Sequence, residues 1–161
     1  MGKSTIKLTN HLPVITANVE KIALQWLEET SGELEAQTKR NSASDTGQTK
    51  SSWTHKVDAN AMEAVAGSDL ENAIWEEYGT GEYAAEGNGR SGAWYVPVEA
   101  VTGNSKPTYN GKVEIVYGKG GQAFYKTNGK QPKKMLHNAW DKVIPKAKKA
   151  LPAKLKNIKQ P

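Results

Sequence analysis

Apolar residues recur roughly every 3.6 positions near both ends of the chain, which is the period of an amphipathic helix. Near the N-terminus this pattern covers residues 12–29, and Pro13 lies where proline is favoured in the first turn of a helix. Ser31-Gly32 weakens the pattern, which then resumes as far as Arg40. The apolar positions of this predicted helix are Ile15, Val19, Ile22, Trp26 and Leu27.

A second apolar stripe begins after Pro132, with lysines on the opposite face. Pro145 and Pro152 each remove a helical hydrogen bond, so the sequence predicts a helix over residues 133–144 and then a kinked or frayed continuation. The stripe consists of Met135, Leu136, Ala139, Trp140, Val143, Ile144, Ala147, Leu151, Leu155 and Ile158.

The middle of the chain contains patterns typical of short strands. Apolar and polar residues alternate over residues 53–57, and a turn at residues 58–60 leads to a second apolar run at residues 61–66. This arrangement indicates an antiparallel hairpin. Residues 73–78 fit either a short helix or a strand, and we favour a short helical turn.

Residues 82–122 are rich in glycine and only weakly hydrophobic. Strand character is confined to residues 94–98 and 113–117, and residues 124–125 form a returning strand. A connection this long within a compact domain is unusual unless it is functional. We therefore interpret it as a protruding hairpin arm whose apolar side chains pack on a neighbouring copy. The predicted interface residues are Tyr78, Trp94, Tyr95, Val96, Val113, Ile115 and Tyr117.

Together these elements predict an α+β fold, in which N-terminal and C-terminal helices pack on a small, mostly antiparallel sheet and the β-hairpin arm protrudes. A chain of 161 residues and 17.5 kDa fits a single domain spanning residues 1–161. Trp26 and Trp140 lie on the apolar stripes of the two helices, so we expect them to share a core.

Charge is unevenly distributed along the chain. The net charge is +5, but from Lys126 onward there are eleven lysines and one acidic residue, Asp141, so this part carries 11 − 1 = +10. Its basic C-terminal tail, residues 146–161, either aims a positive face at an acidic partner such as DNA or forms a solvated helix face. The candidate basic residues are Lys146, Lys148, Lys149, Lys154, Lys156 and Lys159.

The composition excludes several kinds of chemical site and argues against a place in a membrane. The chain has no cysteine, which excludes disulfides, thiolate nucleophiles and cysteine-based zinc sites. Its apolar runs are too short for a membrane span, and its N-terminus lacks the order of a signal peptide. We expect a protein of the cytosol or of a virion, with no membrane partner.

Candidate catalytic motifs fail on their context. Residues 87–92 match the G-x-G-x-x-G spelling of a dinucleotide loop, but an extended segment at residues 94–97 follows where the mechanism requires a helix, so we interpret the motif as a turn. Ser51 and Ser52 lack the pattern of a nucleophile elbow. Glu76-Glu77 is an adjacent pair of the kind usually found as solvated charge.

The histidines His11, His55 and His137 lack a second ligand at metal-binding spacing. For His55, on the apolar side of its strand, a partly buried and hydrogen-bonded role is favoured over a general base. We assign no catalytic, metal-binding or cofactor-binding residue and expect no enzymatic activity.

Several short motifs occur in an order that resembles a known family. They are Tyr78-Gly79-Thr80-Gly81, Gly87-Asn88-Gly89-Arg90, Trp94-Tyr95, the Gly-x-x-Pro-x-x-x-Leu spacing of Gly129, Pro132 and Leu136, and the upstream Asp45-Thr46-Gly47 followed by Ser51-Ser52. Over residues 12–145 the chain is similar to the tail-component family of long-tailed phages and prophages, whose members are head–tail joining, neck or tail-completion proteins. It departs from the family pattern at Gln48-Thr49-Lys50 and Lys134-Met135-Leu136.

The resemblance implies the same α+β arrangement and a role set by shape and contact. It implies a homo-oligomeric ring, six-fold in symmetry, at the head–tail junction of a virion assembled in the host cytoplasm. Other neck and tail proteins would be its partners, and DNA would pass through the lumen without sequence-specific binding. The alternative is a basic nucleic-acid-binding protein acting through the lysine-rich C-terminal helix, and a weaker one is a small hydrolase.

Overall fold

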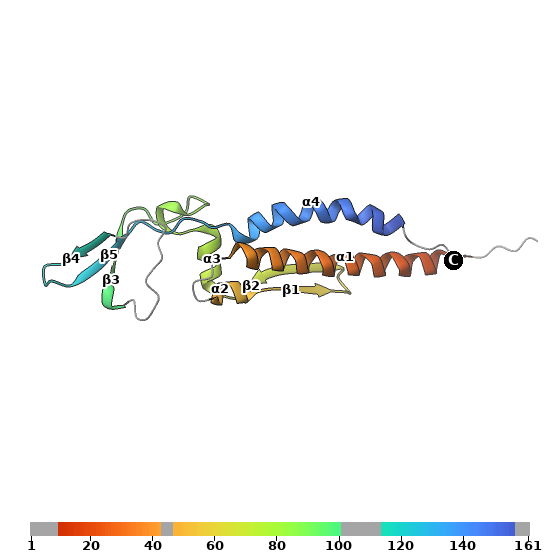
Figure 1. The fold of residues 1–161 in the computed structure, drawn as a ribbon, viewed down its shortest axis with the longest axis horizontal. Helices are drawn as coiled ribbons and strands as arrows, with labels where there is room; N and C mark the ends of the chain where they lie inside the picture. Colours follow the sequence, from red (N-terminus) through yellow and green to blue (C-terminus); the bar gives the residue numbers. More distant parts are fainter. Residues whose placement is uncertain (1–9, 43–46, 101–113, 157–161) are drawn as a thin grey trace, which may run out of the picture.

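The computed structural model describes residues 10–42, 47–100 and 114–156, and these form the predicted α+β fold. The molecule is elongated, with two long helices beside a β-hairpin at one end and a three-stranded sheet at the other (Figure 1). The helices are α1 (Leu12–Asn41), α2 (Gln48–Ser52), α3 (Glu71–Tyr78) and α4 (Met135–Lys156), with short 3-10 helices η1 (Gly81–Tyr83) and η2 (Val98–Ala100). The strands are β1 (Trp53–Asp58), β2 (Glu63–Ser68), β3 (Trp94–Pro97), β4 (Glu114–Tyr117) and β5 (Ala123–Thr127).

Helix α1 is one continuous helix of 30 residues, so the predicted weakening at Ser31-Gly32 is wrong. The Ser31 hydroxyl donates to the carbonyl of Leu27 at 2.7 Å, which keeps this polar side chain compatible with the helix. At Gly32 a Cβ would lie 3.6 Å from the His55 ring. Packing against β1 therefore stabilises a segment that has weak helical propensity by itself.

The predicted hairpin of β1 and β2 is confirmed, with His55 opposite Ala66 in an antiparallel register. The carboxylate of Asp58 closes the turn by accepting from the amides of Asn60 and Ala61, at 2.8 and 3.1 Å. Residues 71–78 form the predicted short helix, α3.

Helix α4 has 22 residues and passes through both Pro145 and Pro152, so the continuation predicted after residue 144 is part of the same helix. Both prolines are on the solvent side of the helix, where water can satisfy the carbonyls that lose their amide partners. The segment predicted as a basic tail is therefore helical as far as Lys156, and the rest of it, including Lys159, lies outside the described residues.

Helices α1 and α4 pack antiparallel, as two hydrogen bonds between them show. Asn41, at the end of α1, donates to the carbonyl of Met135 at the start of α4, and the Trp26 indole donates to the carbonyl of Ala147. The predicted pairing of Trp26 with Trp140 is wrong, since the Trp140 side chain is 53% exposed. The antiparallel register places small Ala147 beside Trp26 and turns Trp140 away from α1. The core instead has two clusters, of Leu34, Ala139 and Val143 and of Trp53, Ala73 and Met135, with Leu136 packed against both.

The strands form two separate antiparallel sheets, where a single small sheet was predicted. The β1–β2 hairpin lies against α1, whereas the three-stranded sheet, in the order β3-β5-β4, protrudes at the far end of the molecule (Figure 1). We call this second sheet the distal sheet. Its central strand is β5, so the arm predicted for residues 82–122 extends to Thr127.

Within the described residues, none of the helices combines the length and apolar character needed to cross a membrane.

Candidate functional site: the distal sheet and its joint

Two chain segments cross where the distal sheet meets the helical body, and we call this crossing the joint. Residues 78–82 and 128–132 run side by side, since the Thr80 amide donates to the carbonyl of Lys130 at 2.9 Å and the Lys130 amide donates back at 3.2 Å. The Glu82 amide adds a bond to the carbonyl of Asn128 at 2.9 Å. Two motifs distant in the sequence, Tyr-Gly-Thr-Gly and Asn-Gly-Lys-Gln-Pro, thus form one structural unit.

Glycines make this close crossing possible. Gly79, Gly81 and Gly129 all have positive φ, at 73°, 62° and 126°. A Cβ at Gly79 would lie 2.7 Å from the carbonyl oxygen of Lys130, and one at Gly81 would collide with the carbonyl oxygen of Asn128. These glycines are needed for backbone geometry as well as for space.

Two buried carboxylates fasten the joint to the helices. Glu76 and Glu77, in the last turn of α3, are only 7% and 6% exposed, so their interpretation as solvated charge is wrong. Glu76 forms ion pairs with Lys130 and Lys133. Glu77 accepts from the amides of Leu136 and His137 at 2.8 and 2.9 Å, and so caps the first turn of α4.

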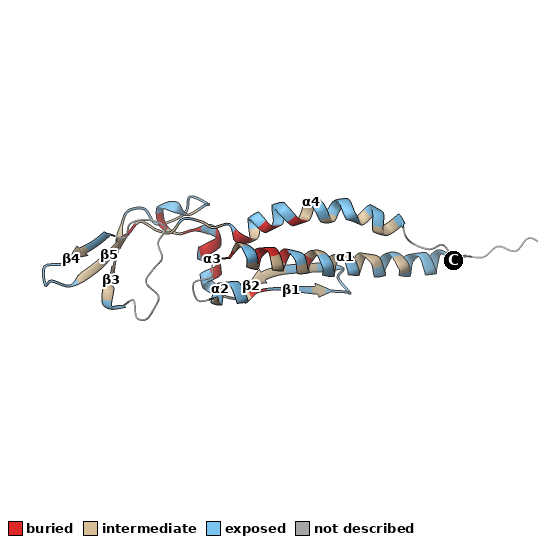
Figure 2. Ribbon diagram, in the orientation of Figure 1, coloured by how far each residue is buried: buried red, intermediate tan, exposed pale blue. Residues whose placement is uncertain are grey.

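The sequence did contain a signal for these two residues. They immediately precede the Gly79 turn, and lysines recur at positions 130, 133 and 134, just before α4. Sequence spacing alone could not reveal that Lys130, 54 positions after Glu76 in the chain, returns to contact it. Figure 2 shows the buried residues concentrated at α3, the joint and the facing surfaces of α1 and α4.

The segment before β3 wraps against the joint. Glu82 accepts from the Gly92 amide at 3.1 Å and from the Asn128 side chain at 2.8 Å. The Arg90 guanidinium lies 5.6 Å from the centre of the Trp94 ring. Residues 87–92 are irregular and are followed by strand β3, so the helix that a dinucleotide loop requires after G-x-G-x-x-G is not there.

The strand register divides the predicted interface residues between the two faces of the distal sheet. Val96 pairs with Tyr125, which pairs with Ile115, so these three lie in one row across the sheet. Trp94 and Tyr117 lie on the same face at positions two residues away, whereas Tyr95 lies on the opposite face. Tyr117 is 74% exposed, Tyr95 57% and Ile115 48%.

Two predicted interface residues are not on this sheet. Tyr78 is the last residue of α3, where the joint begins, and Val113 lies outside the described residues.

The predicted basic residues Lys146, Lys148, Lys149, Lys154 and Lys156 all lie on α4. Lys154 forms an ion pair with Glu29 of α1 at 2.6 Å. Lys146 and Lys154 line a groove of about 260 Å³ between the helices, with Glu29 and Glu33 on its α1 side. The positive charge of α4 is therefore partly balanced by acidic residues of α1.

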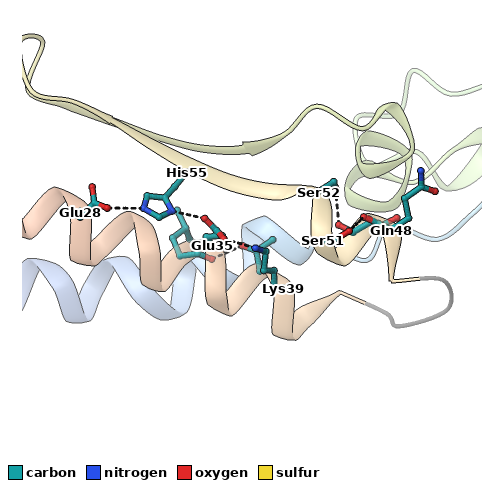
Figure 3. Close-up of polar contacts among 10 residues, drawn as sticks. Glu28, Glu35, Lys39, Gln48, Ser51, Ser52 and His55 are labelled. Atoms are coloured by element: carbon teal, nitrogen blue, oxygen red, sulfur yellow. Dashed lines mark hydrogen bonds and ion pairs between the residues drawn. The ribbon is translucent and has the colours of Figure 1, made fainter.

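A second polar cluster joins β1 to α1, away from the distal sheet. The His55 ring lies between two α1 carboxylates, with Nδ1 at 2.5 Å from Glu35 and Nε2 at 3.3 Å from Glu28 (Figure 3). These contacts confirm the predicted partly buried, hydrogen-bonded histidine. They raise the pKa of His55, chiefly through the hydrogen bond to Glu35, and the pKa of Glu35 is lowered by hydrogen bonds from Lys39 and then His55.

The serines near this cluster bond to other groups. Ser51 donates to the carbonyl of Gln48 at 3.0 Å, and the Ser52 hydroxyl lies 2.7 Å from that of Ser68. Figure 3 shows both serines on the α2 side, separated from His55 along the chain. Over the described ranges, no group of three or more His, Asp or Glu side chains has an arrangement that could hold a metal ion.

Comparison of the chain with protein-family models, curated proteins and solved structures gives no match.

We predict that alanine at Gly81 destabilises the protein by more than about 2 kcal/mol, because it combines backbone strain with a collision at the Asn128 carbonyl. The matched control is Gly87→Ala, where φ is also positive, at 69°, but nothing lies within 4 Å of the added Cβ. The control should cost about 1 kcal/mol from strain alone. Urea unfolding measures both, and equal losses would contradict the close crossing.

A second prediction concerns pH. The pKa of His55 is raised above its ordinary value of 6.5, so its stabilising contribution is fully present below that value and is lost as pH rises through the raised pKa. His55→Gln should cost on the order of 1 kcal/mol at about pH 6 and progressively less in alkaline solution. Unfolding free energies of wild type and variant, measured against pH, test this, and parallel curves would refute it.

Proposed function

We propose that the chain is a structural protein of a phage virion, which forms a ring at the head–tail junction and completes or joins the tail. The observation that carries this proposal is the distal sheet, which exposes aromatic and aliphatic side chains while standing clear of the helical body. Such side chains on a projecting element are typical of a surface that a neighbouring molecule covers.

The joint supports the same proposal. The motifs that resemble the tail-component family lie largely where the two segments cross, and their glycines and buried carboxylates fix the direction of the sheet relative to α1 and α4. A subunit that assembles by contact needs its projecting part held in a constant direction, since flexible contacts lose binding energy to ordering.

In this proposal each copy contributes its helical body to the ring and its distal sheet to a neighbour. Neck and tail proteins above and below the ring are the other partners, and DNA passes through the central opening. The lysines of α4 then face either DNA or an acidic surface of the next ring.

The test uses the phage or prophage genome that encodes the chain, with its gene deleted and supplied in trans. A double variant, Ile115→Ser with Tyr117→Ser, should keep the wild-type unfolding transition, because both side chains are exposed. It should yield heads and tails that fail to join, as seen by electron microscopy and loss of infectious particles. The control is Val65→Ser, on a strand of the other sheet and 67% exposed, which should support joining.

Normal joining by the double variant would remove the distal sheet from the mechanism. A gene that lies outside any set of phage structural genes, with no effect on particle assembly, would overturn the proposal as a whole.

The second candidate is nucleic-acid binding through α4, favoured by its lysines. Among the described residues only Lys154 of the five predicted lysines there is ion-paired, so the others are available to phosphates. If these four lysines each contact a phosphate, duplex binding should weaken with salt at a logarithmic slope of about −4. Replacing Lys146, Lys148 and Lys149 by glutamate should reduce that slope by about 3.

Filter binding against salt measures this slope, with a random-sequence duplex as the probe. If the triple variant loses duplex binding and still supports joining, the nucleic-acid candidate is excluded as the principal function.

A further inference from the structure

A groove of about 560 Å³ lies on the body side of the joint, between the end of α3 and the first turns of α4. Its apolar lining includes Tyr78 and Trp140, which are 51% and 53% exposed, together with Leu136 and Ala85. Two half-exposed aromatic rings on neighbouring elements are an unusual feature for a surface that faces only water.

The groove is held open by the same contacts that build the joint. The Glu77 carboxylate binds the amides of Leu136 and His137, so the start of α4 is fixed against the end of α3. Tyr78 and Trp140 therefore project from two elements that are tied together at their backbones. Such a preformed concave site needs little reorganisation to bind a partner.

Acidic groups predominate on its rim. Glu86 and Asp141 are exposed carboxylates, whereas Lys134 supplies one ammonium. His137 lies 3.6 Å from Asp141 at the rim. A fitting partner is thus narrow and apolar, with a positive charge beside the apolar part.

The tip of the β4–β5 hairpin has these properties. Its turn is closed by hydrogen bonds from the Gly118 amide to the Gln122 carbonyl and from the Gly121 amide to the Gly118 carbonyl, both 2.9 Å. Three of its residues are glycines, which makes the turn narrow, and its charged residue is Lys119, which is exposed. Tyr117, at 74% exposed, immediately precedes the turn.

We infer that this groove receives the β4–β5 tip of a second copy, with Tyr117 packed between Tyr78 and Trp140 and Lys119 facing Glu86 and Asp141. A copy cannot fill its own groove, because the tip lies at the far end of the distal sheet, away from α3 and α4 (Figure 1). The contact joins two different surfaces, and such head-to-tail contacts generate rings when the rotation closes. The inference rests on the self-assembly in the proposed function and names the site that receives the arm.

Engineered cysteines give a direct test, since the chain has none of its own. Two single variants of the full chain, Lys119→Cys and Asp141→Cys, are mixed under mild oxidation, with one carrying a mass tag. A disulfide requires Cα atoms within about 7 Å, so a mixed dimer should form rapidly only if the tip lies at the groove. The control replaces Asp141→Cys with Lys56→Cys, an exposed position on β1.

Self-association measured by sedimentation tests the energetics. Tyr117→Ser and Trp140→Ser should each weaken it about tenfold or more, as expected for aromatic residues at the centre of an interface. Lys119→Glu should also weaken it, and adding Asp141→Lys to Lys119→Glu should restore part of the loss. Val65→Ser should have no effect, and thermal unfolding checks that each variant is folded.

The outcomes separate this inference from the proposed function. Association without preferential Lys119→Cys to Asp141→Cys coupling would place the contact elsewhere and overturn the inference, while leaving ring assembly possible. A chain that stays monomeric from about 1 µM to about 1 mM would overturn it as well. Specific coupling in a protein that does not affect head–tail joining would uphold the contact and refute the phage role.

Discussion

The crossing of residues 78–82 and 128–132 is the contact on which the rest of the structure depends. It brings together two segments separated by the whole distal sheet, and their backbones approach so closely that side chains are excluded at Gly79, Gly81 and Gly129. Its hydrogen bonds begin at Asn128, directly after the last residue of β5. The same crossing delivers the chain to Met135 in position to start α4. Fold and projecting surface are thus linked through one backbone contact.

Buried charge strengthens this link. A carboxylate in an apolar environment is costly unless it is paired or hydrogen-bonded. Glu76 meets two lysines and Glu77 meets two backbone amides at a helix start, so neither is left without partners. Because all of these partners come from the segment after β5, the α3 carboxylates are satisfied only when the distal sheet is folded back correctly. Glu76 and Glu77 therefore favour this arrangement of the chain over others.

The helical body is built on a different principle. Helices α1 and α4 approach through small residues such as Ala139 and Ala147, and the hairpin is attached to α1 by packing together with the His55 carboxylate cluster. The register that places Ala147 beside Trp26 leaves Trp140 outside the contact between the helices. Trp140 instead lines a groove with Tyr78 of α3 and is more than half exposed.

Local pattern in the sequence was sufficient to predict most elements. The period of 3.6 predicted both long helices, alternation predicted the β1–β2 hairpin, and strand propensity located β3, β4 and β5. Signals based on single residues were less reliable. Ser31-Gly32 and Pro145 suggested helix interruptions. Packing on β1 stabilises the helix at Ser31-Gly32. At Pro145, exposure to solvent lets water bind the carbonyl that loses its helical hydrogen bond. The sequence predicted the apolar residues of the arm. It did not predict which of them share a face of the distal sheet, because that depends on how β3 and β4 pair with β5.

By itself, the sequence determined the α+β class, the positions of α1, α3, α4 and the five strands, and the concentration of positive charge on the C-terminal helix, since these depend on residues close together in the chain. The tertiary structure decided that the strands form two sheets, that Glu76 and Glu77 are buried, and that Trp140 lies beside Tyr78 at a groove. The physical reason is that these features depend on segments distant in the chain: β3 pairs with β5 across the intervening β4, and the carboxylates of α3 meet partners more than 50 residues later. These segments are held together by the glycine-rich backbone crossing and by the partners of the buried carboxylates. A local period of apolar residues contains no information about either contact.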